Sequence, residues 1–137
     1  DGEVVVLDAR GRPDFGALQH ALAQGDRAAL RYVVFDCLHH DGDDLRPWPL
    51  ERRKARLADL VRRLPGDAPI RYVDHVVGRG AGVFAEACVL GLEGVVSKRR
   101  DGPYREGRRH PDWVKVRCTR RQDVVIGGFT RPGQGRK

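Results

Sequence analysis

Two cations, Lys115 and Arg117, stand two residues apart in the segment 113–118, which has the sequence Trp-Val-Lys-Val-Arg-Cys. Alternate side chains of a β-strand point to opposite faces. If this segment is a strand, both cations therefore share a face with Trp113, while the two valines and Cys118 face the core. Paired cations on a rigid strand can hold a phosphate group, because they stabilise negative charge without being reorganised during a reaction. The alternative is a pair of solvated cations on an exposed sheet face.

Glutamates stand at the edges of two apolar segments that are typical of strands. Glu93 precedes the run 94–99 and Glu3 opens the run 3–8, each beside a glycine. A carboxylate at the buried edge of a strand needs a partner, which can be an arginine, backbone donors or a hard cation such as Mg²⁺. A structural salt bridge is the simpler alternative to a metal site. Strand periodicity also predicts that Lys98 points away from Glu93, because the two residues have opposite parity.

One aromatic residue, Phe35, lies inside the predicted strand 30–39, between Val34 and Asp36. An aromatic side chain in a strand normally packs in the core, whereas a ring at the wall of a pocket can stack on a nucleobase. Both interpretations remain open from the residues alone.

Positive charge is concentrated toward the C-terminal end of the chain. The whole sequence has a net charge of +7, and the segment 98–121 alone contains ten basic and three acidic residues. Such a concentration is typical of proteins that bind phosphate-bearing partners, although a solvated basic face would have the same composition. Five of these arginines are candidate contacts to a nucleic-acid backbone: Arg99, Arg100, Arg105, Arg108 and Arg109.

The chain has 137 residues, of which 40% are hydrophobic and 33% charged. This length suits one domain, or one domain and the beginning of another. No apolar run approaches the roughly 20 residues that cross a bilayer and no signal-peptide pattern opens the chain, so we do not expect a membrane protein.

The three cysteines, Cys37, Cys88 and Cys118, lie far apart without a C-x-x-C. Their spacing predicts neither a disulfide framework nor a zinc finger and favours a reducing, cytosolic setting. Because there is no methionine and Asp1 leads directly into a strand-like run, we expect a piece of a longer protein.

Periodicity and turn residues predict an α+β layout with strands that are mainly antiparallel. The strands are expected at 3–8, 30–39, 70–76, 94–99, 112–118 and 124–129. Three amphipathic helices are expected at about 15–23, 50–64 and 83–90. The second of these helices has an apolar stripe, formed by Leu57, Leu60, Val61 and Leu64. It stands opposite an arginine-rich face, formed by Arg52, Arg53, Arg56 and Arg63.

Four short segments, taken in order, carry a family resemblance. They are 1–8 (DGEVVVLD), 32–36 (YVVFD), 92–98 (LEGVVSK) and 113–118 (WVKVRC). These segments resemble motifs III, IIIa, IV and V of the nucleotidyltransferase (adenylation) domain of ATP-dependent DNA ligases. The closest likeness is to the ligase module of bacterial end-joining ligases of the D type, which has a loop similar to 101–109 between motifs IV and V.

The resemblance implies part of an ATP-grasp-like nucleotidyltransferase domain, with mainly antiparallel sheets and flanking helices. Residues 1–121 would form the C-terminal portion of this adenylation domain. Residues 122–137 would begin an OB-fold domain, since 122–130 resemble its first strand.

The resemblance also implies a reaction in three steps. A lysine amine attacks the α-phosphate of ATP, AMP then passes to the 5′-phosphate at a DNA nick, and the 3′-hydroxyl finally displaces AMP. Glu93, Lys115 and Arg117 would be the catalytic residues, and Glu3 and Glu93 would hold Mg²⁺ or Mn²⁺. Phe35 would stack on adenine, and the complete set of implied nucleotide-binding residues is Glu3, Phe35, Lys98, Lys115 and Arg117.

One departure from the family pattern concerns the nucleophile. The family's first motif, K-x-D-G, supplies the lysine that receives AMP, and no K-x-D-G occurs in this sequence. In family order the nucleophile would lie upstream of Asp1, so we expect the chain alone to be unable to adenylate itself. Motif V also has Arg117 where the family often has a second lysine, which keeps the charge but changes the geometry of a phosphate contact.

Two alternatives to a DNA ligase remain. An RNA ligase or a capping guanylyltransferase shares the same motif order, and a basic module could bind nucleic acid without catalysis. The DNA ligase interpretation implies nicked double-stranded DNA as the partner, in the nucleoid of a bacterial cytoplasm. Other repair domains on the same polypeptide, or end-binding repair proteins, are further expected partners.

Overall fold

A computed structural model describes residues 1–107 and 110–118. The helices in this part of the chain are α1 (Phe15–Gln24), α2 (Leu50–Arg62) and α3 (Gly80–Val89). The strands are β1 (Gly2–Val5), β2 (Arg31–Val34), β3 (His39–His40), β4 (Asp43–Asp44), β5 (Ile70–Tyr72), β6 (Gly94–Lys98) and β7 (Trp113–Arg117). The predicted strand at 124–129 and the predicted start of an OB-fold domain lie outside the described residues.

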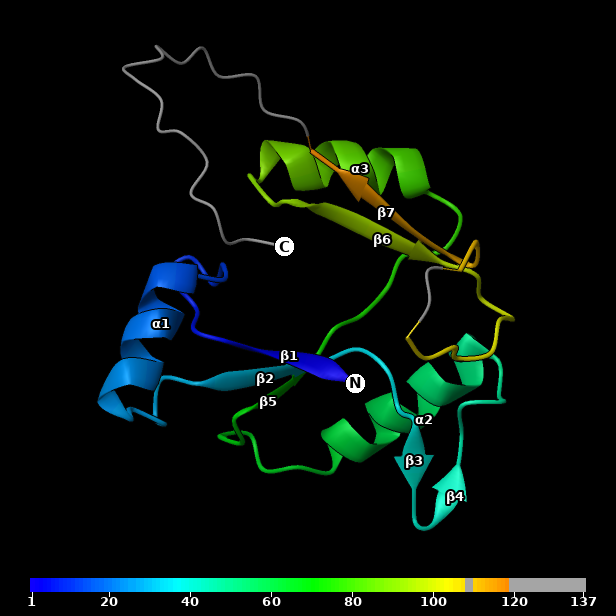
Figure 1. The fold of residues 1–137 in the computed structure, drawn as a ribbon, viewed down its shortest axis with the longest axis horizontal. Coiled ribbons are helices and arrows are strands. Elements are labelled where there is room, and N and C mark those ends of the chain that lie inside the picture. Colours follow the sequence, from blue (N-terminus) through cyan, green and yellow to red (C-terminus); the bar gives the residue numbers. More distant parts are fainter. Residues whose placement is uncertain (108–109, 119–137) are drawn as a thin grey trace, which may run out of the picture.

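The first sheet has the strand order β1-β2-β5 (Figure 1). β1 pairs antiparallel with β2, so that Glu3 lies opposite Val33, whereas β5 pairs parallel with β2. Parallel neighbours need a crossover connection, and here it contains the β3–β4 hairpin and α2. Three of the four strand pairings described are antiparallel, which agrees with the predicted α+β layout.

The core lies between this sheet and α2. Four buried residues form its centre: Val34, Cys37, Leu45 and Leu57. Partly buried side chains from α2 and β5 pack around them, including two further members of the predicted apolar stripe: Leu60 and Val61. Three of the four predicted stripe residues therefore attach α2 to the sheet by hydrophobic burial, whereas Leu64 lies beyond the end of the helix and is 39% exposed.

The predicted strand 30–39 is shorter in the structure, because β2 ends at Val34. The N–H groups of Phe35 and Asp36 both donate to the carbonyl of Asp1 (3.0 and 3.3 Å), so the chain leaves the regular ladder at this point. Pairing resumes only at β3. The interruption places Asp36 in the interior, where it is 1% exposed.

Asp36 is paired with Arg53 of α2, and both side chains are completely buried. Arg53 Nε and Nη2 donate to the two carboxylate oxygens at 2.8 and 2.9 Å. Arg53 Nη1 also donates to the carbonyls of Trp48 and Gly102. Arg53 was expected on the arginine-rich face opposite the apolar stripe, but unlike a typical charged side chain it is completely buried. A buried carboxylate needs a partner for its charge, and Arg53 supplies a bidentate one.

The second sheet is the antiparallel β6–β7 hairpin, which lies beside α3 (Figure 1). The loop after β6 connects it to the start of α2, because the N–H groups of Leu50 and Glu51 donate to the carbonyls of Gly102 and Arg100 (both 3.1 Å). The hairpin is thus attached to the first sheet through the N-terminal turn of α2 and through Arg53.

A disulfide joins Cys88 to Cys118, with a Cα–Cα distance of 5.4 Å and a sequence separation of 30. The prediction of no disulfide was wrong, because it rested on spacing along the chain. Packing of α3 against β6, and pairing of β6 with β7, bring these distant residues together. Cys37 is free and buried, and burial raises the pKa of its thiol.

Among the helices of the described residues, none has the length and apolar character needed to cross a membrane.

The buried Asp36–Arg53 pair predicts a large effect of a single substitution. Arg53→Met leaves a buried carboxylate without its partner, so the free energy of unfolding should fall by about 3–5 kcal/mol. Chemical denaturation of the chain measures this loss. Arg62→Met is the matched control, because the Arg62–Asp59 pair is exposed and should contribute less than about 1 kcal/mol. Equal stabilities of the two variants would contradict the role assigned to the buried pair.

Candidate functional site

The β6–β7 register gathers cations on one face of the hairpin. Lys98 lies opposite Trp113, and Val96 lies opposite Lys115. Residues directly opposite each other in an antiparallel pair point to the same side, so Lys98, Trp113, Lys115 and Arg117 share a face. The structure thus confirms that Lys115 and Arg117 lie side by side.

The other face of the hairpin differs from the prediction. Val114 and Val116 were expected to face the core, but they are 50% and 39% exposed within the described structure. The reason is that α3 packs mainly against β6, so it leaves much of β7 uncovered.

The carboxylate of Glu93 contacts both cations of β7. Its Oε1 lies 2.9 Å from Lys115 Nζ and 3.4 Å from Arg117 Nε. The hydrogen bond from Lys115, followed by the charges of Lys115 and Arg117, lowers the pKa of Glu93. All three side chains are exposed, and exposed ion pairs contribute little to stability. We call these three residues the Glu93 cluster; its groups are free to exchange partners with a ligand.

Gly94 explains why Glu93 reaches this face against the predicted parity. Gly94 has φ +155°, and a Cβ there would lie 2.1 Å from the carbonyl oxygen of Val116. Only glycine tolerates that approach, and the unusual backbone interrupts strand alternation at the first residue of β6. The expectation that Glu93 and Lys98 point to opposite faces was therefore wrong, because it assumed a regular strand through Gly94.

Aromatic rings from two parts of the chain meet at Lys98. Its Nζ lies 4.7 Å from the ring centroid of Phe35 and 4.1 Å from that of Trp113. Tyr104 packs edge-on against Trp113, with their centroids 5.1 Å apart. Burial is the main cause that lowers the pKa of Lys98. Phe35, from the end of β2, is therefore adjacent to the cationic face of the hairpin.

Sequence reasoning missed Lys54, a residue of α2 that lies next to this group. Lys54 is 6% exposed, and its Nζ donates to the carbonyls of Val73 (2.8 Å) and Phe35 (3.4 Å). Burial, followed by the charge of Lys98, lowers the pKa of Lys54. The hydrogen bond from Lys54 Nζ therefore helps to fix the backbone carbonyl of Phe35. The only available signal was the rarity of lysine, since the chain has four lysines among 26 basic residues.

The remaining predicted site residues are less closely grouped. Glu3 is exposed on β1, and no ion pair or hydrogen bond joins it to Glu93 in the described structure. No cluster of three or more histidine, cysteine or acidic residues that could hold a metal occurs among residues 1–107 and 110–118. A metal site formed by Glu3 and Glu93 therefore stays a prediction.

The predicted nucleic-acid contacts lie in the loop between β6 and β7. Arg99 pairs with Asp101 (2.7 Å), Arg100 pairs with Glu51 (3.2 Å), and Arg105 is exposed. Arg108 and Arg109 lie outside the described residues. The structure therefore leaves the role of this loop in nucleic-acid binding as a prediction.

A family model described as the ATP dependent DNA ligase domain matches residues 1–117 of the chain. The chain belongs to this family. All four motif segments lie within or overlap the match, so the resemblance seen in the sequence is confirmed. The Glu93 cluster and the Phe35–Lys98–Trp113 group are thus features of an ATP-dependent DNA ligase domain.

Two relatives illustrate how this chain compares with longer proteins of the family. The multifunctional non-homologous end joining protein LigD of Pseudomonas aeruginosa is 46% identical over 137 residues, which are 100% of this chain and 16% of that protein. The SPbeta prophage-derived DNA ligase-like protein LigB of Bacillus subtilis is 32% identical over 132 residues, which are 96% of this chain and 48% of that protein. The chain therefore spans less than half of either relative.

Solved structures agree with the family assignment. The ligase domain from M. tuberculosis LigD matches with a TM-score of 0.71 and 35% sequence identity, over 85% of this chain and 37% of that one. A mycobacterial DNA ligase D complexed with ATP and MES matches with a TM-score of 0.70 and 35% identity, over 85% and 36% of the two chains. The α+β fold of this DNA ligase domain is therefore confirmed.

The Glu93 cluster predicts a measurable coupling between Lys115 and Glu93. Lys115→Met removes the hydrogen bond that lowers the pKa of Glu93, so this pKa should rise toward its ordinary value; an NMR pH titration of the Glu93 carboxyl measures it. In the wild type the folded-state pKa is the lower one. The stabilising interaction is therefore present above the unfolded-state pKa and is lost as the pH falls through the folded-state value. Lys98→Met serves as the control and should leave the titration unchanged. An unchanged Glu93 titration in Lys115→Met would contradict the pairing.

Proposed function

We propose that this chain is the part of an ATP-dependent DNA ligase that binds adenylate, and that its parent protein seals nicks in double-stranded DNA during strand-break repair. The observation that carries the proposal is the juxtaposition of Phe35 with Lys98 beside the paired cations Lys115 and Arg117. In a chain of this family, such a group offers a ring for a base and positive charges for a phosphate.

Each residue of the site has a role suited to its chemistry. The Phe35 ring stacks on adenine, with Lys54 and Lys98 holding it in place. Lys115 and Arg117 bind the α-phosphate and stabilise the charge that develops there during transfer. Positioning and charge neutralisation dominate phosphoryl transfer, so fixed cations on a strand are well matched to it.

Glu93 and Glu3 are the residues that would hold Mg²⁺ or Mn²⁺. Glu93 fits this role because its carboxylate is exposed and ionised at neutral pH, and hard cations prefer carboxylate oxygens. The metal would neutralise phosphate charge when bound. Without ligands, Lys115 and Arg117 form ion pairs with the Glu93 carboxylate. Phosphate binding would draw these two cations away from it and leave the carboxylate available to the metal.

The substrate and partners follow from the same proposal. The exposed arginines of the loop between β6 and β7, among them Arg99, Arg100 and Arg105, hold the DNA backbone without regard to sequence, and this contact weakens as salt rises. Residues 122–137, which lie outside the described residues, would begin an OB-fold domain of the parent. The parent acts in the bacterial cytoplasm at the nucleoid, alongside other repair domains or end-binding proteins.

The nucleophilic lysine comes from a part of the parent that is not in this sequence, since the 137 residues contain no K-x-D-G. The isolated chain should therefore gain no AMP when it is incubated with ATP and Mg²⁺. Mass spectrometry of the intact chain checks this expectation, and a stable AMP adduct would overturn it.

The sharpest test of the proposed function uses Glu93→Gln in the parent ligase. This isosteric change removes the charge that serves the metal, so sealing of nicked DNA should fall by about 100-fold or more. Glu106→Gln is the matched control, because Glu106 is an exposed glutamate that pairs with Arg46 outside the cluster. A nicked RNA duplex assayed in parallel distinguishes DNA from RNA ligation. Normal sealing by Glu93→Gln would remove Glu93 from the mechanism.

A further inference from the structure

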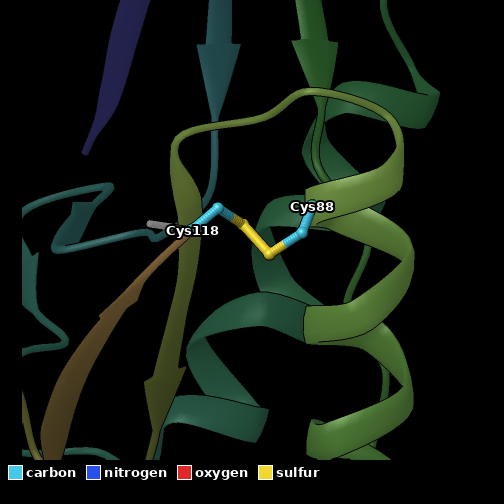
Figure 2. The surroundings of a disulfide bond; sticks show 2 residues. All are labelled: Cys88 and Cys118. Atoms are coloured by element: carbon cyan, nitrogen blue, oxygen red, sulfur yellow. A yellow bond between two sulfur atoms is a disulfide. The ribbon is translucent and has the colours of Figure 1, made fainter. Parts of the chain in front are cut away.

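The disulfide lies at the turn that carries Glu93. Figure 2 shows it bridging the last turn of α3, at Cys88, to the end of β7, at Cys118, beside the connection into β6. Cys118 directly follows Arg117, a member of the Glu93 cluster. The bond is therefore close to the proposed phosphate-binding cations, although neither cysteine belongs to them.

A backbone hydrogen bond closes the same turn from its other side. The N–H of Cys118 donates to the carbonyl of Glu93 at 2.8 Å. Both ends of the segment 88–93 are thus attached to Cys118. Cys88 is attached by the disulfide, and Glu93 by the backbone hydrogen bond. While the disulfide is intact, the backbone of Glu93 is held against the end of β7.

The other contacts at this turn are all noncovalent. The N–H of Leu92 donates to the carbonyl of Ala87 (2.9 Å), and Gly94 pairs with Arg117 in the β6–β7 ladder. Gly91 and Gly94, on either side of Glu93, both have positive φ values (+78° and +155°), and glycine has the greatest backbone freedom to lose on ordering. The ion pairs of Glu93 are exposed and contribute little to stability. Without the disulfide, only noncovalent contacts hold Glu93 against the end of β7, namely the hydrogen bond from Cys118 and the pairing of Gly94 with Arg117.

The chemistry of the two thiols suits reversible modification. Both cysteines are partly exposed, whereas Cys37 is buried and burial raises the pKa of its thiol. Disulfides in proteins of reducing compartments are usually transient and redox-sensing. Exposed thiols react with small disulfides far more readily than buried ones.

We propose that Cys88 and Cys118 are a redox modification site, at which a small disulfide such as oxidised glutathione forms a reversible cross-link that fixes Glu93 against β7. One thiolate attacks a sulfur of the small disulfide, which forms a mixed disulfide and releases one thiolate. The second cysteine thiolate then attacks the protein sulfur of that mixed disulfide. The second small thiolate leaves, and the Cys88–Cys118 bond forms. The two cysteines lose two hydrogens in total, and the small disulfide is reduced to two thiols.

Thiol counting across glutathione buffers tests the modification itself. The wild-type chain and Cys37→Ala are equilibrated at graded ratios of oxidised to reduced glutathione, alkylated and analysed by mass spectrometry. Both should lose two alkylatable thiols together as the ratio rises, yield a peptide that links residue 88 to residue 118, and recover both thiols with dithiothreitol. Three results would each overturn the proposal: both thiols remain alkylatable at every ratio, the reaction stops at the mixed disulfide, or the disulfide forms between two chains.

Amide hydrogen exchange tests whether the cross-link fixes the turn. The Cys118 N–H should exchange at least about tenfold more slowly in the oxidised chain than in the reduced chain. The free energy that a disulfide commonly contributes to stability corresponds to a change of more than tenfold in an equilibrium constant. Cys88→Ser provides the control and should exchange at one rate in both buffers. Equal rates in the two states of the wild type would contradict the coupling. Neither readout involves nucleotide, so failure here is distinct from failure of the proposed ligase function.

Discussion

The buried ion pair between Asp36 and Arg53 connects the parts of this domain. Its carboxylate comes from the point where β2 ends, and its guanidinium comes from α2 and also binds the carbonyl of Gly102 in the loop after β6. Burying two charges is unfavourable unless each is fully hydrogen-bonded, and here every donor and acceptor in the pair has a partner. The pair thereby fixes Phe35, which adjoins Asp36, relative to the loop that continues from Lys98.

The Glu93 cluster is the opposite kind of electrostatic structure. Its carboxylate and two cations are exposed, so the pairing stabilises the fold little, and water or a ligand can replace either partner. Rigid positioning comes from the buried pair and the hairpin register, while exchangeable charge comes from the cluster. A site for phosphoryl transfer needs both properties, because fixed geometry must surround charges that change partners.

Local patterns in the sequence predicted most of the elements. The helix expected at about 15–23 is α1, which begins at Phe15 with Asp14 as its N-cap, and Leu57 of the apolar stripe packs into the core as its spacing requires. What local patterns could not supply were contacts between distant residues. Arg53 was grouped with the other arginines of its helix, and helical periodicity could not reveal its buried partner, which lies 17 residues earlier. The Cys88–Cys118 bond depends on the docking of α3, and the reach of Glu93 depends on the backbone at Gly94, which strand periodicity cannot anticipate.

Nuclear Overhauser contacts around Phe35 test most directly whether the buried pair organises the site. In the wild-type chain, the Phe35 ring should show contacts to the side chain of Lys98, whose Nζ lies 4.7 Å from the ring centroid. In Arg53→Met these contacts should disappear, while the cross-strand contacts between Val95 and Val116 within the hairpin persist. Phe35–Lys98 contacts of undiminished intensity in Arg53→Met would contradict the account, because the two parts of the site would then be held together without the ion pair.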